Sequence, residues 1–298
     1  MTMLKLTGSE KLMYDVIAAL ENGGVPVVYK GAMITKLILN ENHFDDFARE
    51  TQDIDASWAG ASNPPMEQLA DMLNRAVAKL ELAAIVKRAY GGQKSAGFII
   101  VDAGGNEKLS IDIDMRRAID SCTYQYGNVT FMGATPGNVI ADKISAISTD
   151  KVFRRAKDLI DLYALAHCVT IKTADIRAIW ERESRAIESF DAFRNRLDDL
   201  KHAYKMLRRL TAKPDFDKLY GYLTHFLAPF IEAREADLVW SSGLGDWADD
   251  KARNNPTAKN ARQPDFIGHL HGLKAKADKE NTNNHQPPKQ HDKSDTEH

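Results

Sequence analysis

The sequence predicts an α+β protein, in which helices pack against a mixed or antiparallel sheet and a helical domain follows. Three observations support this class. Up to about residue 135, segments with helical spacing of apolar residues alternate with short β-branched segments. From Pro136 to about Pro229 the spacing is helical and strand signals nearly disappear. The 298 residues are 43% hydrophobic and 28% charged, which is the balance of a globular protein with a sizeable core.

The first elements are expected to be a helix, a strand, a helix and a second strand. Residues 8–21 repeat apolar side chains at helical spacing after a Ser9 cap, and a Gly-Gly pair ends the pattern. The β-branched segment 25–31 is predicted to be a strand and 32–40 a helix. The next strand is expected around 51–57.

A helix and three strands are expected next. Residues 66–82 follow the breaker Asn63-Pro64-Pro65 and repeat apolar residues every three to four positions, as an amphipathic helix does. Strand signals then cover 84–90, 96–103 and 109–115, and a hairpin-like Gly-Gly-Asn separates the last two.

The second half of the chain is predicted to be helical, with 140–165 forming one long charged helix. From Ser241 the content of Gly, Asn, Pro and Lys rises. Residues 277–298 contain no aromatic and almost no aliphatic side chain, so they bury too little surface to offset their ordering entropy. These shifts in composition predict a mixed core over 1–142, a helical C-terminal domain over 143–250 and a disordered polar tail over 251–298.

The charge of the chain is nearly balanced overall but unevenly distributed. A net charge of -2 identifies neither nucleic acid nor a membrane as a partner. Residues 1–142 carry 13 basic and 18 acidic groups, whereas 143–213 carry 16 and 10. This arrangement suits a metal-using carboxylate site beside a surface for a polyanion, and a solvated helix face explains the basic segment equally well.

Cysteine usage and the absence of long apolar segments exclude several classes of protein. Cys122 and Cys168 are the only cysteines and have no metal-ligand spacing, so neither a disulfide framework nor a zinc site is predicted. The first twenty residues contain no continuous apolar segment, and no run of about 18 apolar residues occurs elsewhere. We therefore expect a soluble, cytoplasmic protein with no membrane partner.

Two predicted strands carry paired aspartates. Period-two alternation in RETQDIDASW puts Asp53 and Asp55 on one face of a strand. LSIDIDM does the same with Asp112 and Asp114. Like charges on one face repel, and either a divalent cation or solvent must relieve the repulsion. A solvated strand face explains either pair alone, but together they favour a site for magnesium, which takes oxygen ligands and pairs with substrate phosphates.

Two further segments carry candidate residues. Lys30 and Gly31 end a strand just before a helix, where a small residue lets backbone N–H groups approach a phosphate, although no Walker or GxGxxG motif is present. The helix 140–165 carries six charged candidates: Lys143, Arg154, Arg155, Lys157, Asp158 and Asp161. Its Lys157 and Asp161 are also spaced for an ordinary helix salt bridge.

Taken in order, YKGAMITKL, RETQDIDASW, LSIDIDM, ADKISAI and FRRAKDLIDLYAL resemble segments of the AbiEii-type nucleotidyltransferase toxins. That family is similar to the DNA polymerase beta nucleotidyltransferase superfamily and belongs to type IV toxin–antitoxin and abortive-infection systems. The resemblance covers residues from about 25 to 168. It implies a polymerase beta-like nucleotidyltransferase core over 1–142 with a helical C-terminal domain.

The resemblance also assigns roles to the candidate residues. The implied metal ligands are Asp53, Asp55, Asp112 and Asp114, with Asp112 the better match to the third carboxylate. The implied catalytic residues are Asp53, Asp55, Asp112, Lys143 and Asp158. The implied nucleotide-binding residues are Lys30, Gly31, Lys143, Arg155, Asp158 and Asp161. One departure is Ala32, which replaces the second glycine of the family's KGG turn.

By resemblance, the reaction is attack of an acceptor hydroxyl on the α-phosphate of a nucleoside triphosphate, with Mg²⁺ as the cofactor. The implied acceptor is RNA, including transfer RNA ends in some members, and the implied partner is a cognate antitoxin in a toxin–antitoxin or phage-defence system. Two alternatives stay open on the residues: a protein or small-molecule acceptor, and a non-catalytic module that binds nucleic acid or protein on the same fold.

Overall fold

The computed structural model describes residues 6–88, 95–116, 118–208, 210 and 212–250, and these residues belong to one compact unit of the chain. The predicted disordered tail over 251–298 and the end of the predicted strand 84–90 lie outside the described residues. The proposed division between residues 142 and 143 falls inside helix α4 (Pro136–Ile147), so the two proposed domains share that helix.

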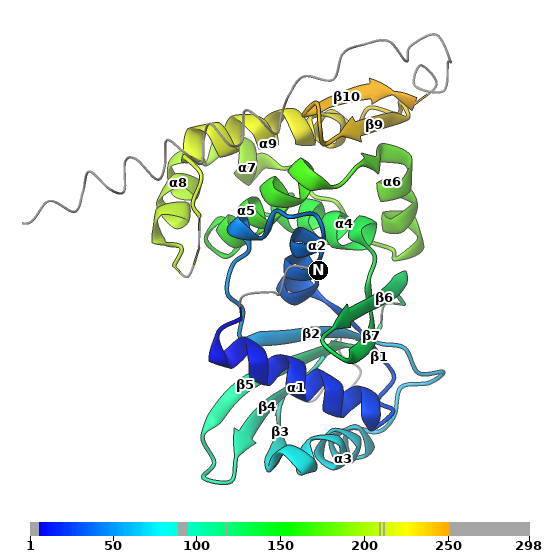
Figure 1. The fold of residues 1–298 in the computed structure, drawn as a ribbon. Coiled ribbons are helices and arrows are strands. Elements are labelled where there is room, and N and C mark those ends of the chain that lie inside the picture. Colours follow the sequence, from blue (N-terminus) through cyan, green and yellow to red (C-terminus); the bar gives the residue numbers. More distant parts are fainter. Residues whose placement is uncertain (1–5, 89–94, 117, 209, 211, 251–298) are drawn as a thin grey trace, which may run out of the picture. The chain divides into compact units, whose positions relative to one another are not determined.

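A seven-stranded mixed sheet forms the centre of the first half of the described chain (Figure 1). Its order is β3-β4-β5-β2-β1-β7-β6. The β2–β5 and β1–β7 pairs are parallel and the other neighbours are antiparallel, which confirms the mixed sheet that the sequence predicts. The strands are β1 (Val27–Lys30), β2 (Asp53–Trp58), β3 (Leu82–Arg88), β4 (Ser95–Asp102), β5 (Glu107–Asp114), β6 (Ser121–Tyr126) and β7 (Val129–Ala134).

Helices cover the sheet and then continue as the helical region. The helices α1 (Gly8–Asn22), α2 (Gly31–Glu41) and α3 (Met66–Val77) belong to the first half, with short 3-10 turns at Asp45–Phe47 and Ala78–Leu80. The later helices are α4, α5 (Val152–Cys168), α6 (Thr173–Arg182), α7 (Asp191–Asn195), α8 (Leu197–Met206) and α9 (Phe216–Ile231). In Figure 1, α1 crosses in front of the strands, α3 lies near the lower end of the sheet, and α2, α4 and α5 lie above it. No described helix combines the length and the apolar character needed to cross a bilayer.

The predicted Ser9 cap of the first helix is wrong, because Thr7 is the N-cap residue. The Thr7 hydroxyl accepts a hydrogen bond from the Glu10 backbone N–H, and the Glu10 carboxylate accepts one from the Thr7 backbone N–H. This reciprocal pair is a capping box, which requires Ser or Thr three residues before Glu or Gln. Thr7 stands at that spacing from Glu10, and Ser9 does not.

The single long helix predicted over 140–165 is also wrong, because the chain forms two helices, α4 and α5, joined by residues 148–151. The Ser148 and Thr149 hydroxyls donate to the backbone carbonyls of Ser145 and Ala146, at 2.8 Å each. Such bonds satisfy carbonyls that would otherwise lack partners at a helix end. The break lets α4 and α5 pack against each other, which a continuous helix would not allow.

The structure contains strands where the sequence pattern predicts none. The hairpin β6–β7 occupies residues that the pattern leaves unassigned, and a three-stranded sheet of order β10-β9-β8 lies in the region predicted to be helical. Its strands are β8 (Ile171–Lys172), β9 (Leu238–Ser241) and β10 (Asp246–Asp249). These strands are two to four residues long, too short for an alternating pattern to identify.

Candidate active site

Two neighbouring parallel strands present their acidic residues on one face of the sheet. β2 and β5 pair so that Asp55 lies opposite Asp112 and Asp53 opposite Ser110. The alternate residues Ile54, Ile111 and Ile113 are at most 1% exposed in the core. Burial of the isoleucines fixes which face the aspartates occupy, because a shift of one residue would exchange the two sets. The two predicted DxD pairs are therefore brought together, and we call this set the carboxylate face: Asp53, Asp55, Asp112 and Asp114.

The Lys30-Gly31 turn lies at the carboxylate face. β1 pairs with β2 so that Lys30 is opposite Asp55, and the Lys30 Nζ atom lies 3.4 Å from Asp114 Oδ2. Gly31 begins α2 with φ +74°, a left-handed conformation that favours glycine. A Cβ atom at Gly31 would overlap the Asp55 carboxylate. Gly31 is thus required both by its own backbone angle and by the approach of Asp55.

We expect Gly31→Ala to impair the site more than the fold. A left-handed alanine costs about 1–2 kcal/mol of stability, and the displacement of Asp55 lowers the transfer rate about a hundredfold. The matched control is Gly105→Ala, since Gly105 has φ +77° and a Cβ atom there would meet nothing within 4 Å. Denaturation should show similar losses of stability for both variants, and only Gly31→Ala should lose activity. Equal activity of the two variants would contradict this assignment.

Hydrogen bonds and ion pairs hold the acidic side chains in place. Ser110 Oγ donates to Asp53 Oδ1 at 2.6 Å, and Arg88 forms an ion pair with Asp112. Asp53 is exposed, whereas Asp55 is partly buried and burial raises its pKa. Ionisation of Asp55 therefore costs free energy in the folded chain, and a nearby cation would favour the ionised form. Arg88 is absent from the sequence-based candidates.

The carboxylate face fits a hard divalent cation by its donor chemistry. All four of its side chains offer carboxylate oxygens, the ligands that Mg²⁺ takes in proteins, and Asp55 and Asp112 lie in register on adjacent strands. Among the described residues, no three acidic, His or Cys side chains are gathered closely enough to hold a metal ion. Asp112 and Asp114 bind Arg88 and Lys30 instead. A cation held here would replace these basic partners.

Helices α4 and α5 enclose a buried ion network. Lys143 Nζ lies 2.9 Å from Asp158 Oδ1 and 2.7 Å from Asp161 Oδ2, and these three side chains are at most 8% exposed. Arg49 Nε binds the same Asp161 carboxylate at 3.1 and 3.2 Å. Arg155, with 27% of its side chain exposed, reaches Asp158 Oδ2 at 3.3 Å. We call these five residues the ion network: Arg49, Lys143, Arg155, Asp158 and Asp161.

The network changes how two sequence signals are interpreted. Asp161 pairs with Lys143 and Arg49, while Lys157, its alternative helix partner, is exposed. Arg49 was not among the sequence-based candidates, although it lies four residues before Asp53 in RETQDID. A basic residue just ahead of a DxD strand was the available signal. Its partner on α5 is 112 residues away, which local spacing cannot reveal.

Arg49 is expected to make stability depend on pH. Burial acts to raise the pKa of Asp161, but Lys143 and Arg49 overcome it and hold that pKa below its ordinary value. Because folding lowers the pKa of Asp161, its ionised carboxylate stabilises the fold at any pH above the pKa of the unfolded chain. This stabilisation is lost as the pH falls through the pKa of Asp161 in the folded chain. Arg49→Gln should therefore be less stable than the wild type at neutral pH. The difference should shrink in acid below about pH 4. Thermal melts across pH test this, and a constant difference would contradict it.

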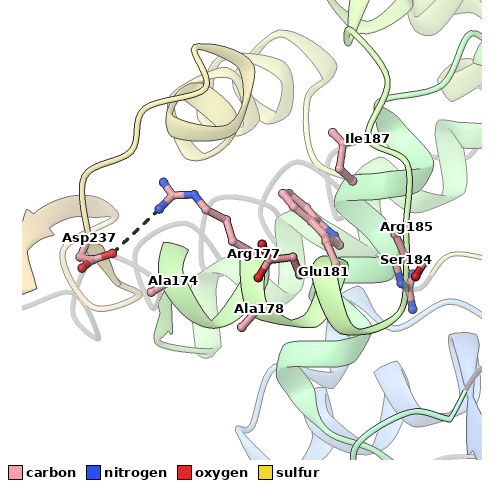
Figure 2. Close-up of a pocket in the computed structure, with 9 residues that line it drawn as sticks. Ala174, Arg177, Ala178, Glu181, Ser184, Arg185, Ile187 and Asp237 are labelled. Carbon is pink, nitrogen blue, oxygen red and sulfur yellow. Dashed lines mark ion pairs between the residues drawn. The ribbon is translucent and has the colours of Figure 1, made fainter.

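Among the cavities on the described surface, two are lined by several charged side chains. One of about 630 Å³ adjoins the carboxylate face, with Asp114, Arg116, Asp120 and Arg182 in its lining. The other, of about 650 Å³, lies in the helical region (Figure 2). In this cavity, Arg177 forms an ion pair with Asp237 and donates a hydrogen bond to the Glu235 carbonyl at 3.2 Å. The Arg177 side chain therefore connects α6 to the segment before β9. Of these two cavities, the first is the one that includes a residue of the carboxylate face, Asp114.

Comparisons with known proteins identify relatives of this chain. The model of a family described as the nucleotidyl transferase AbiEii toxin of the type IV toxin–antitoxin system matches residues 30–255. No curated protein matches the chain. Among solved structures, JHP933 from Helicobacter pylori is 16% identical with a TM-score of 0.47, over 77% of this chain and 96% of that chain. The nucleotidyltransferase toxin MenT4 of Mycobacterium tuberculosis is 14% identical with a TM-score of 0.41, over 74% and 89%.

The mixed sheet with its carboxylate face and the family match define the chain as a nucleotidyltransferase. It belongs to the AbiEii family of nucleotidyltransferase toxins, since the family match covers most of the chain. The family, the fold class and the enzyme class expected from the sequence are therefore confirmed. Membership in a type IV toxin–antitoxin family also implies a nucleotide substrate and an antitoxin partner.

Proposed function

We propose that this toxin uses Mg²⁺ to transfer a nucleotide from a nucleoside triphosphate to RNA, and that a cognate antitoxin restrains it in a phage-defence system. The observation that carries the proposal is the alignment of Asp55 with Asp112 on neighbouring strands, beside the Lys30-Gly31 turn. A nucleotidyl transfer needs carboxylates for metal ions and a close backbone approach for phosphates at one place. Both are present at this face.

The residues of the carboxylate face have distinct parts in this reaction. Asp53, Asp55 and Asp112 would hold the cations, with Asp114 beside them. When bound, Mg²⁺ lowers the pKa of the attacking hydroxyl and neutralises charge on the departing pyrophosphate. The acceptor oxygen forms a bond to the α-phosphorus as the bond to the β-phosphate oxygen breaks. Asp112 accepts the hydroxyl proton, as a general base within hydrogen-bond reach does.

The basic residues around the face position the triphosphate. Lys30 and the backbone at Gly31, where α2 begins, approach the phosphates, and glycine leaves room for that approach. Arg155 is the most exposed basic member of the ion network, so it can contact a phosphate while it remains near Asp158. Lys143, Asp158 and Asp161 hold α4 and α5 together. Their proposed role is to position this wall of the site.

The RNA acceptor is supported by charge. Residues 143–213 carry a net excess of basic groups, and several exposed members surround the start of α5. Such a surface binds a nucleic-acid backbone regardless of sequence, because counterions are released. The cavity beside Asp114 is also lined by Arg116 and by Arg182, which forms an ion pair with Asp120. RNA is therefore favoured over an uncharged small molecule.

A labelling experiment identifies the nucleotide and the acceptor. The purified chain is incubated with Mg²⁺, total cellular RNA and each α-labelled nucleoside triphosphate in turn, and the products are treated with ribonuclease or protease. We expect the label in ribonuclease-sensitive material with one preferred nucleotide. Label that survives ribonuclease and is released by protease would establish a protein acceptor, and label in neither fraction would direct the search to small molecules.

A further inference from the structure

Phe153 lies on the surface at the first turn of α5. Its side chain is 61% exposed, more than any other large apolar side chain among the described residues. Exposure of most of an aromatic side chain leaves apolar area in water, and aromatic residues are enriched where proteins bind partners. The ring is therefore accessible to a partner.

The side of α5 that carries Phe153 leads into the ion network. Phe153, Lys157 and Asp161 follow each other at intervals of four residues, so they lie along one side of the helix. Asp161 is buried, whereas Lys157 and Phe153 are exposed. Arg49, which contacts Asp161, lies four residues before Asp53 of the carboxylate face. Along this side of α5, Lys157 lies one turn from Asp161 and Phe153 one turn further out.

Basic residues flank Phe153 in the sequence. Lys151, Arg154 and Lys157 are all exposed, and Asp150 is the one acidic residue between 148 and 157. An aromatic ring among cations is the combination by which proteins bind single-stranded nucleic acid, since the ring stacks on a base and the cations neutralise phosphates. A protein partner would not require this excess of positive charge. We call these four residues the rim platform: Lys151, Phe153, Arg154 and Lys157.

We propose that the rim platform binds the single-stranded end of the RNA acceptor, with Phe153 stacked on a base and its basic neighbours on the flanking phosphates. The inference rests on the proposed RNA transferase function and deepens it. Paired bases would not stack on Phe153, so the platform selects unpaired ends over blunt duplexes.

The test measures binding of the full chain to a 5′-labelled single-stranded RNA of about ten nucleotides, without nucleoside triphosphate. The variants are Phe153→Ala and Phe153→Tyr, and the control is Leu244→Ala, which removes a side chain that is 59% exposed in the turn between β9 and β10. We expect Phe153→Ala to weaken binding about fivefold to a hundredfold. Phe153→Tyr and Leu244→Ala should bind like the wild type, and affinity for a blunt RNA duplex should not change.

Kinetics separate this inference from the function on which it rests. With RNA as acceptor, Phe153→Ala should raise the KM for RNA and leave the KM for the nucleoside triphosphate unchanged. Wild-type-like RNA binding by Phe153→Ala, a rise in the nucleotide KM alone, or no binding of single-stranded RNA by the wild type would each overturn the platform. Binding that depends on Phe153 without any label transfer to RNA would instead contradict the proposed function and leave the platform standing.

Discussion

Replacing Asp55 with Asn is expected to lower nucleotidyl transfer about a thousandfold or more, because the change removes a central metal-binding carboxylate. The free energy of unfolding should stay the same or increase. Burial raises the pKa of Asp55, so its ionised form is unfavourable in the folded chain, and a neutral amide removes that cost. Loss of activity with unchanged or greater stability is the pattern of a residue retained for function at the expense of the fold.

The matched control is Asp71→Asn. Asp71 is exposed on α3, whereas Asp55 lies beside α2 at the carboxylate face. Denaturation curves and initial rates with an α-labelled nucleotide should be measured for both variants and the wild type. An Asp55→Asn protein that keeps wild-type rates would show that the carboxylate face is not the catalytic centre. A strongly destabilised one would show that Asp55 has a structural role.

Replacing Lys143 with Met is expected to destabilise the chain by about 3–5 kcal/mol, because the buried carboxylates of Asp158 and Asp161 lose the cation they share. Each then keeps one basic partner, Arg155 or Arg49, at its edge. Lys143 is the cation that contacts both Asp158 and Asp161, and all three side chains are buried. Urea unfolding measures the change. A variant that keeps its stability but has a raised KM for the nucleotide would show instead that Lys143 binds phosphate directly.

A double variant tests whether charge balance explains the loss. Lys143→Met with Asp158→Leu removes one cation and one anion and leaves the Arg49–Asp161 pair intact. Apolar replacement of a buried ion pair is often neutral or stabilising. The double variant should therefore recover most of the stability that Lys143→Met loses. No recovery would mean that Lys143 acts through packing rather than charge.

The parts of the site that lie within one strand or one turn could be predicted from the sequence. Alternation with period two places Asp53 with Asp55, and Asp112 with Asp114, whatever the rest of the fold does. The Lys30-Gly31 turn follows from a β-branched segment that meets a helical one. These signals depend on neighbours only two to four residues apart, so they survive without any knowledge of tertiary structure.

The parts that depend on distant contacts could not be predicted. The register that sets Asp55 opposite Asp112 joins two strands that are distant in sequence. Asp53 and Ser110, which form a hydrogen bond across the same pair of strands, are 57 residues apart. Arg88 carries no motif of its own, and both Arg49 and Arg88 gain their roles from carboxylates that are distant in sequence, Asp161 and Asp112. The break between α4 and α5 depends on Ser and Thr side chains that form hydrogen bonds with the backbone. The spacing of apolar residues gives no information about these bonds.

The most direct test of the central claim compares the fate of two labels. The chain and its Asp55→Asn variant are incubated with Mg²⁺, RNA and the preferred nucleoside triphosphate, labelled either at the α- or at the γ-phosphate. Nucleotidyl transfer from the carboxylate face predicts that the α-label enters RNA, that the γ-label leaves as pyrophosphate, and that Asp55→Asn shows neither. Transfer of the γ-label to the acceptor, or undiminished α-label transfer by Asp55→Asn, would contradict the account.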